Sequence, residues 1–255
     1  MRATSDGLVE LAADAGRNPV PVATLRANMA HALSLGLPTI MEIAPHDGAL
    51  TLVAGGPSAA DFLDDLRGRG PIMVCGSAHD WLIGQGVIPQ AAIVLDPQPH
   101  VADFLHLHHP GVVYYIASTC DPAVFNRLAG RRVVVWHALT YDDQEDEHPT
   151  LAFVPGGSTV GLRAISLGLV LGFRSFDLYG YDSCLRGQAT HAYPGSDRGS
   201  PPRDVWLDGR RFRCTPQMAR QALDFRALCA ALGHMFDVAI YGDGLLAAML
   251  ERKAA

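Results

Sequence analysis

Two glycine-containing turns, about a hundred residues apart, are the segments of this sequence best suited to holding a phosphate. The first, Ala54-Gly55-Gly56-Pro57-Ser58, follows an apolar run, and the second, Pro155-Gly156-Gly157-Ser158-Thr159, opens a stretch with helical spacing. Glycine lets a backbone bend sharply and approach a ligand closely. The first N–H groups of a helix point outward beside the positive end of its dipole. If both turns face one ligand, we expect that ligand to carry phosphate. Taken singly, each turn is equally consistent with a connection between a strand and a helix that binds nothing.

The basic side chains of the sequence limit the ways in which a phosphate could be bound. Lys253 is the only lysine, so the other basic residues are arginines. A P-loop requires Gly-x-x-x-x-Gly-Lys-Ser/Thr, which the sequence lacks, and Schiff-base or pyridoxal-phosphate chemistry requires a lysine inside the fold. These enzyme classes are excluded. A phosphate has to be held by arginines, hydroxyls, backbone N–H groups or a metal ion.

Length and composition predict a globular protein that works outside membranes. At 255 residues, 49% of them hydrophobic and 18% charged, the chain can bury a substantial core. No apolar run approaches the roughly 20 residues of a membrane helix, and the N-terminus lacks a signal core, so a cytoplasmic location is expected. The net charge of −6 argues against nucleic-acid binding. The five cysteines are scattered without a Cys-x-x-Cys pair, which argues against disulfides and structural zinc.

Short apolar runs alternate along the chain with stretches of helical spacing. The predicted strands are Leu50–Ala54, Ile72–Cys75, Ala92–Leu95, Val112–Ala117, Arg132–Trp136, Ser175–Tyr179 and Phe236–Tyr241. The predicted helices between them are Ser58–Arg67, Ala78–Gln85, His100–Leu107, Pro122–Leu128, Ser158–Leu171 and Pro216–Leu232. This alternation predicts an α/β, Rossmann-like fold: a mostly parallel sheet with helices on both faces. Residues 1–47, with a predicted helix at 20–36, form an N-terminal helical extension, and residues 48–255 form a single nucleotide-binding domain.

Ligands of such sheets bind beyond the carboxyl ends of the strands, and polar residues follow several predicted strands here. Ser77 follows the second strand, Asp96 the third, and Tyr181 and Asp182 the sixth. Asp and Ser at strand ends often serve only as caps and turn formers. Their convergence at one edge of the sheet favours a binding site.

Residues 183–214 interrupt the alternation and are predicted to form a lid. A loop of this length in a compact domain usually serves a site. It contains Thr190-His191-Ala192-Tyr193 and then four arginines, Arg203, Arg210, Arg211 and Arg213. Its second half also has the pattern of a hairpin turning at Asp208-Gly209. The two interpretations are compatible, because a hairpin can be the lid.

The order of these motifs resembles that of a known family. The motifs are Gly-Gly-Pro-Ser at 55–58, Leu95-Asp96, Gly-Gly-Ser-Thr-Val-Gly at 156–161, Leu-Gly-Phe at 171–173, Tyr-Gly-Tyr-Asp at 179–182 and Thr-His-Ala-Tyr at 190–193. Over about residues 48–250 the chain resembles the domain of unknown function 115. That family includes motility accessory factors, linked to flagellin glycosylation, and archaeal MptE-type 6-hydroxymethylpterin diphosphokinases. The same order is similar to the bacterial sialyltransferases of glycosyltransferase family 42, which use a CMP-activated sugar.

The resemblance implies a set of site residues. Those expected to line the nucleotide are Gly55, Gly56, Pro57, Ser58, Ser77, Asp96, Gly156, Gly157, Ser158, Thr159, Tyr181 and Tyr193. The catalytic residues would be His191 and Asp182. Asp182 would lie at the floor of the site, and His191 would be the catalytic base, because the sialyltransferases place a catalytic His in the lid. In the diphosphokinase interpretation Asp96 and Asp182 would bind Mg²⁺. That family has a pair of aspartates around the third strand end, where this chain has Asp96 alone.

Three functions follow as hypotheses. The favoured one is a nucleotide-dependent transferase, a glycosyltransferase that uses a nucleotide-activated sugar of CMP type and an acceptor that the sequence does not identify. The first alternative is an MptE-like diphosphokinase that uses ATP and Mg²⁺. The second is a nucleotide-binding accessory protein without catalysis. The sequence leaves homo-oligomerisation open.

Overall fold

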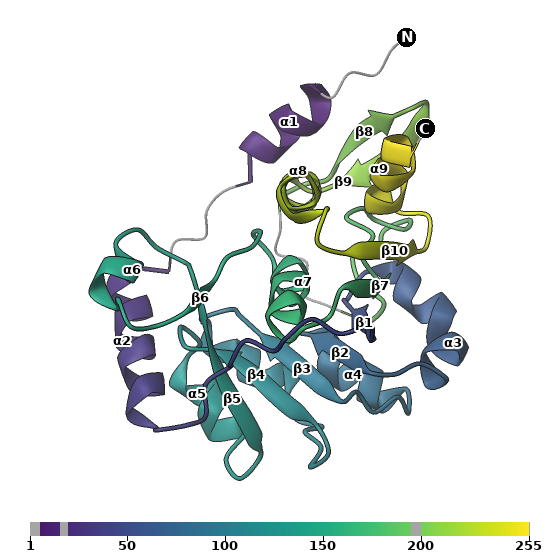
Figure 1. The fold of residues 1–255 in the computed structure, drawn as a ribbon. Helices are drawn as coiled ribbons and strands as arrows, with labels where there is room; N and C mark the ends of the chain where they lie inside the picture. Colours follow the sequence, from purple (N-terminus) through teal and green to yellow (C-terminus); the bar gives the residue numbers. More distant parts are fainter. Residues whose placement is uncertain (1–5, 16–19, 195–199, 255) are drawn as a thin grey trace.

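The computed structural model describes residues 6–15, 20–194 and 200–254, which contain one large parallel β-sheet (Figure 1). Its strand order is β10-β7-β1-β2-β3-β4-β5-β6. The strands are β1 Ala49–Val53, β2 Ile72–Cys75, β3 Ala91–Val94, β4 Val113–Ala117, β5 Arg132–Ala138, β6 Phe153–Val154, β7 Ser175–Tyr179 and β10 Asp237–Tyr241. All seven predicted strands are confirmed. Strand β6 was missed because two residues are too few to form a pattern.

Helices cover both faces of this sheet, so the predicted α/β, Rossmann-like fold is confirmed. They are η1 Pro57–Phe62, α3 Leu63–Arg67, α4 Ala78–Gly84, η2 Pro99–Phe104, α5 Pro122–Arg127, α6 Gln144–Glu147, α7 Val160–Val170, α8 Pro216–Leu232 and α9 Leu245–Ala254. From β1 to β5 the chain steps across the sheet in one direction, then returns through α7 to β7. Because parallel crossovers are right-handed, this reversal places α7 and α8 on the face opposite α3, α4 and α5. Among the described helices, none has the length and apolar character needed to cross a membrane.

The reversal in strand order occurs at β1, which lies between β7 and β2. Strands β1 and β7 are paired along their full length, so Val53 at the end of β1 is opposite Tyr179 at the end of β7. A reversal of this kind opens the space beyond the strand ends, where ligands of doubly wound sheets bind. The loops that follow β1 and β7 therefore occupy the position where a ligand is expected.

Helix α7 lies against β1, β2 and β3 and is buried along most of its length. The helix comes close to the sheet at Gly168, where a Cβ atom would lie 2.5 Å from the Phe176 ring and 3.2 Å from Leu50. A larger residue there would push the helix off the sheet. The close seating of α7 fixes where its N-terminus meets the ends of the strands.

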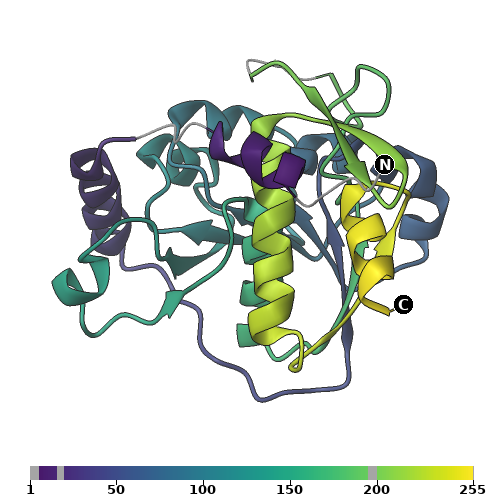
Figure 2. The same ribbon diagram turned by 90° about the horizontal axis from the view of Figure 1, so that it is seen from above.

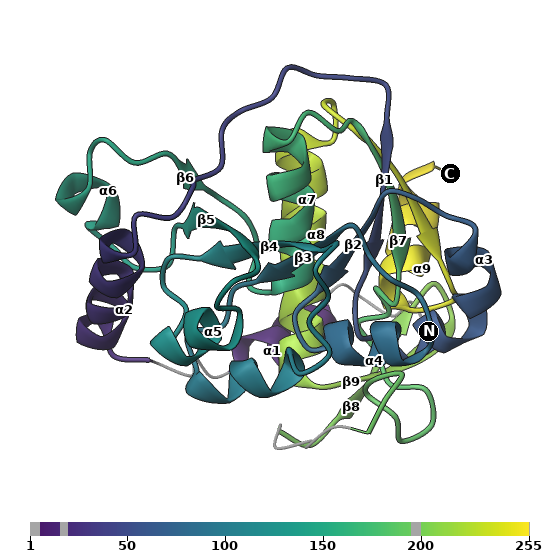
Figure 3. The same ribbon diagram turned by 90° about the horizontal axis from the view of Figure 1, so that it is seen from below.

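The N-terminal extension is attached to the domain at several places. Helix α1 (Asp6–Ala13) packs on α8, and helix α2 (Val22–Ser34) packs on α5 (Figure 2). The following segment crosses from α2 toward β1 (Figure 3), and Pro38 and Ile40 exchange hydrogen bonds with Val135 of β5 at 2.7 and 2.9 Å. The predicted helix at 20–36 is confirmed. The segment after it, at Pro38–Ile40, pairs with the edge of β5 next to β6.

The second half of the predicted lid is an antiparallel hairpin of β8 (Arg203–Leu207) and β9 (Arg210–Cys214). It turns at Asp208-Gly209, whose φ angles of 48° and 79° match the turn that an Asp-Gly pair predicts. The hairpin is braced by ion pairs: Arg203 with Asp14, Arg210 with Glu251 and Arg211 with Asp204. Three of the arginines predicted to meet an anionic ligand thus have carboxylate partners already. Residues 195–199 of the predicted lid lie outside the described residues, and closure of the lid stays a prediction.

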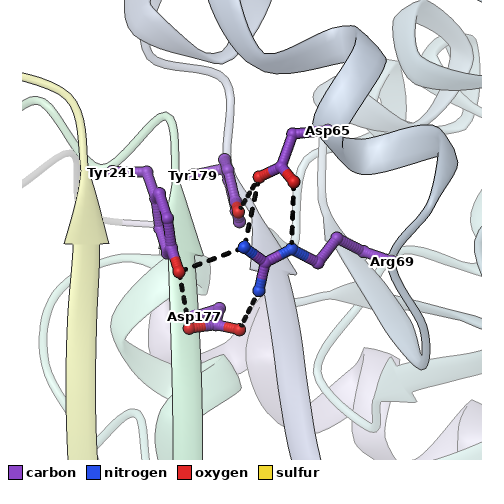
Figure 4. Close-up of polar contacts among 5 residues, drawn as sticks. All are labelled: Asp65, Arg69, Asp177, Tyr179 and Tyr241. Carbon is purple, nitrogen blue, oxygen red and sulfur yellow. Dashed lines mark hydrogen bonds and ion pairs between the residues drawn. The ribbon is translucent and has the colours of Figure 1, made fainter.

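A cluster of polar side chains connects strands β7 and β10, at one edge of the sheet, with helix α3 (Figure 4). The guanidinium of Arg69 donates to Asp177 of β7 at 2.6 Å and to Tyr241 of β10 at 3.1 Å, and it pairs with Asp65 of α3. The rings of Tyr179 and Tyr241 stack with centroids 4.3 Å apart. The hydrogen bond from Tyr179 and the pairing with Arg69 lower the pKa of Asp65. This cluster joins α3 to the last two strands and so steadies the end of β7.

Candidate functional site

The first glycine turn interlocks with the loop that follows β7. Gly56 donates its N–H to the carbonyl of Gly180 at 2.9 Å, and Ala54 donates to Tyr179 at 2.8 Å. A Cβ atom on Gly56 would overlap the Gly180 carbonyl oxygen and the Asp182 carboxylate. Gly180 has a φ of +70°, and a Cβ atom there would overlap the carbonyl of Ala54. Both glycines are therefore required by the close approach of the two loops.

Asp182, which the resemblance implies at the floor of the site, is buried beside this turn. Its Oδ2 accepts the N–H of Ser58 at 3.0 Å, and its carbonyl accepts the N–H of Leu245 at 2.8 Å. Only 7% of the residue is exposed, and this burial raises the pKa of its carboxyl, against the effects of Ser58 and Arg186. Asp182 joins the ends of β1, β7 and β10 at the switch in strand order.

The raised pKa of Asp182 predicts a dependence of stability on pH. The folded protein binds this proton more tightly than the unfolded chain, so the group contributes most below its unfolded pKa of about 4. Its contribution is lost as the pH rises through the folded pKa. We expect Asp182→Asn to gain stability relative to the wild type as the pH rises above about 4, measured by urea unfolding at each pH.

Asp65→Asn is the matched control for this experiment, because the pKa of Asp65 is shifted in the opposite direction. A lowered pKa contributes stability that is fully present above the unfolded value, so this variant should lose ground to the wild type as the pH rises toward about 4 and show a constant deficit at higher pH. An Asp182→Asn difference that is constant with pH would contradict the prediction.

His191 and Tyr193 lie directly against the first turn. Ala192 donates its N–H to the carbonyl of Gly55 at 2.9 Å, and a Cβ atom on Gly55 would lie 2.9 Å from His191 Cδ2. The Tyr193 hydroxyl is 2.6 Å from the Ser77 hydroxyl, and it too would meet a side chain on Gly55. Four of the predicted site residues are thus gathered beyond the ends of β1 and β2.

The second glycine turn reaches the same edge of the sheet through α7. Tyr181, in the loop after β7, donates its hydroxyl to the carbonyl of Gly161 in the first turn of α7 at 2.9 Å. A Cβ atom on Gly76, after β2, would lie 3.3 Å from Val160. Thr159 caps the helix, accepting the N–H of Leu162 at 3.4 Å. The positive end of the α7 dipole therefore lies at the ends of β2 and β7, beside the first turn.

Residues of the protein itself hold both turns in place, which the sequence did not indicate. Asp224 of α8 accepts the N–H of Ser158 at 2.9 Å. The buried guanidinium of Arg163 donates to the carbonyls of Gly157, Val154 and Leu139 at 3.1, 2.7 and 2.7 Å. Burial lowers the pKa of Arg163. Since the N–H groups of Gly56, Ser58 and Ser158 have internal acceptors, a ligand here has to rely on other donors.

Asp96 lies apart from Asp182. It follows β3, three positions along the sheet from β7, which corresponds to about 14 Å at the usual strand spacing. Its Oδ1 accepts the N–H of Gln98 at 2.9 Å, an arrangement typical of a turn. Among the described residues, no three His, Cys, Asp or Glu side chains are grouped as metal ligands. The hypothesis that Asp96 and Asp182 share one Mg²⁺ is therefore not supported by their placement.

Sequence reasoning missed two residues that border the site. Arg186 pairs with Asp61 at 2.6 Å and with Asp243 at 3.6 Å, and its charge acts on Asp182. The ring of Trp81 on α4 lies 5.8 Å from that of Tyr193. A single arginine in a loop carries no local pattern, although its position four residues after Asp182 was a usable signal. Trp81 belongs to an apolar helix face, a pattern that predicts packing in the hydrophobic core and not a binding site.

The family model described as 6-hydroxymethylpterin diphosphokinase MptE-like matches residues 28–188. This range includes both glycine turns and Asp182 but ends before His191. Among solved structures, the chain is similar to the Maf glycosyltransferase from Magnetospirillum magneticum AMB-1, with a TM-score of 0.59 and 18% identity. The similarity covers 91% of this chain but 40% of the other, so this chain spans less than half of that protein. No functionally curated protein matches the sequence.

Proposed function

Because this chain belongs to the MptE-like family, we propose that it is a nucleotide-dependent transferase. Family membership supports a transferase-like function at the level of the family, and the shared fold is compatible with it. Within this class we favour a glycosyltransferase that takes a nucleotide-activated sugar of CMP type. The observation that carries this choice is the His191 ring, which lies against Gly55 at the switch in strand order.

Hydroxyl groups and the α7 dipole would hold the donor in this proposal. The Ser77 and Tyr193 hydroxyls lie beside Gly55, and each would donate a hydrogen bond to a phosphate bound next to them. The N–H groups of Val160 and Gly161, at the start of α7, have no partner within the helix. These neutral donors and the dipole would stabilise the phosphate as it leaves with its negative charge.

His191 would act on the acceptor. As the bond between the acceptor oxygen and the sugar carbon forms and the bond from that carbon to the phosphate oxygen breaks, the acceptor hydroxyl proton passes to His191. The ring Nδ1 lies 2.9 Å from the Thr190 hydroxyl oxygen. The proposal requires the tautomer in which Nδ1–H donates to Thr190, because Nε2 is then the acceptor. Nε2 is bonded to Cδ2, the ring atom nearest Gly55.

A diphosphokinase that uses ATP is the second candidate, and the description of the matched family favours it. The carboxylates that this chain offers for Mg²⁺ fit poorly, because Asp96 and Asp182 follow strands three positions apart. We therefore assign no step to a metal ion in this chain and rank this candidate second.

A thermal-shift panel of CMP, CDP, UDP, GDP and ATP tests the proposal. A ligand at 100 times its Kd adds about 2.7 kcal/mol, which should raise Tm by roughly 5–10 °C for a chain of this size. We expect the largest shift with a cytidine nucleotide, and we expect it to persist in EDTA. A shift for ATP alone that requires Mg²⁺ and is lost in Asp96→Asn would favour the diphosphokinase. Nucleotide binding without transfer to any acceptor would favour the accessory protein.

A further inference from the structure

Helix α7 has an arginine beside each end, and one of them lies where a helix disfavours a cation. At the C-terminal end, Arg174 donates from Nη1 to the carbonyls of Leu169 and Phe173 at 3.0 and 2.8 Å. A cation there is stabilised by the negative end of the dipole. Arg163 lies in the first turn, and its Nε donates at 3.1 Å to the carbonyl of Gly157, which precedes the helix. Its guanidinium therefore adds a positive charge to the positive end of the dipole.

The charge of Arg163 is buried and poorly neutralised. Only 9% of the residue is exposed, and its guanidinium donates to three carbonyls, which carry no net charge. In the part of the chain that the structure describes, no carboxylate forms an ion pair with it. The charge of Asp224 on α8 acts on Arg163, but this carboxylate is paired with Arg220 at 3.1 Å and accepts the N–H of Ser158.

This arrangement disfavours folding when no ligand is bound. A buried cation without a carboxylate partner loses its hydration, and the dipole of α7 repels it. A neutral side chain at this position would avoid both costs. Departures of this kind from what stability favours are expected at functional sites. An anion bound at the start of α7 would balance the charge.

A buried hydroxyl points at the same turn. Ser166 is 4% exposed, and its Oγ has no hydrogen-bond partner among the described residues. A Cβ atom on Gly156 would lie 3.3 Å from this oxygen and 2.6 Å from Cδ of Arg163. The second glycine turn is thus surrounded by a positive and polar environment, which is what the binding of an anion requires.

We propose that Arg163 is the positioning residue of the second glycine turn: it fixes the turn through carbonyl groups, and its unpaired charge increases the affinity of the start of α7 for an anion. That this anion is the phosphate of a nucleotide rests on the proposed function. Because the guanidinium is engaged with carbonyls, it acts on the ligand through the turn and through its electric field. Asp224 has the opposite effect, since its negative charge lies at the same turn beside Ser158.

Calorimetric titration of the full chain with CMP, ATP and inorganic pyrophosphate tests the role of this charge. A unit charge acting over roughly 10 Å at an effective dielectric constant of about 20 changes the affinity for an anion by about tenfold. We expect Arg163→Gln, which keeps N–H donors but is neutral, to bind CMP about tenfold more weakly than the wild type. Arg163→Lys keeps the charge but loses the planar set of donors, and should bind CMP nearly as well as the wild type.

Two further variants separate the effect of charge from that of structure. Asp224→Asn keeps an acceptor for the Ser158 N–H but removes the negative charge, so it should bind CMP more tightly than the wild type. Arg174→Gln is the matched control, because it removes an arginine that donates to two carbonyls at the opposite end of the same helix. It should leave the affinity for CMP unchanged. Urea unfolding of each variant shows whether it is folded.

The outcomes distinguish this proposal from the proposed function. Equal affinities of Arg163→Gln and Arg163→Lys would show that Arg163 only holds the turn, and would overturn the proposal. If Arg163→Gln does not fold, binding by Asp224→Asn that is no tighter than in the wild type has the same meaning. ATP or pyrophosphate binding that follows these charges, without CMP binding, would support the role of Arg163 and count against the proposed function. A wild type that binds none of the three anions would overturn both.

Discussion

His191→Ala is expected to lower the rate of transfer by about 10²- to 10⁴-fold while nucleotide binding persists. Loss of a general base removes proton transfer in the transition state, which typically contributes a factor of this size. Nucleotide binding should change little, because in this proposal the Ser77 and Tyr193 hydroxyls and the α7 dipole hold the donor. The measurement is the initial rate of sugar transfer beside the Kd of the nucleotide from calorimetry.

Thr190→Val provides a graded control for His191. It removes the oxygen that lies 2.9 Å from Nδ1 but keeps the imidazole, so a smaller loss of rate is expected than in His191→Ala. This ordering distinguishes a catalytic base from a ring that only packs on Gly55. Full turnover in His191→Ala would show that another group accepts the proton, leaving His191 at most a binding residue.

Gly56→Ala is expected to destabilise the whole domain. The added methyl group would overlap the Gly180 carbonyl oxygen and the Asp182 carboxylate, and the first of these is backbone that cannot rotate away. Overpacking of this kind costs about 3 kcal/mol, or roughly 6–12 °C in Tm for a chain of this length. The measurement is thermal or urea unfolding of the variant beside the wild type.

Gly84→Ala is the control for this substitution. Gly84 lies within α4, and a Cβ atom there would meet only Leu107, at 3.8 Å. Because alanine favours helix over glycine, this variant should be as stable as the wild type or more so. Equal stability of Gly56→Ala and the wild type would mean that the loops after β1 and β7 move apart easily, contrary to their interlocking here.

Most strands and helices could be predicted because each depends on residues close in sequence, whereas the helices α1, α6 and α9 were missed. The apolar runs at Leu50–Ala54 and Ser175–Tyr179 are strands by their own composition, and Asp208-Gly209 determines its turn by its own backbone preference. The order of strands in the sheet could not be predicted in this way, because no local sequence pattern indicates that β1 pairs with β7. The sequence therefore predicted which loops carry polar residues but not which of them meet.

The roles of the glycines show this limit clearly. Gly157 was predicted to approach a phosphate, but a Cβ atom there would overlap Leu162 and lie 3.1 Å from Asp224. A larger residue at this position would disturb packing whether or not a ligand binds. Asp96 was grouped with Asp182 because both follow strands, and only the strand order shows how far apart they lie. Contacts of this kind depend on residues distant in sequence, which single-sequence patterns do not reveal.

The hydrogen bond from Ser58 to Asp182 joins residues 124 positions apart, which has a consequence for biosynthesis. At ordinary translation speeds the first glycine turn emerges on the order of ten seconds before its partner loop. In that interval β2 to β5 can pair in sequence beside β1, while the other edge of β1 stays open until β7 arrives. Pairing across so long a loop is intrinsically slow. A nascent chain that stops before β7 would therefore carry an exposed edge of β1 and no site, so that ligand could stabilise only finished molecules.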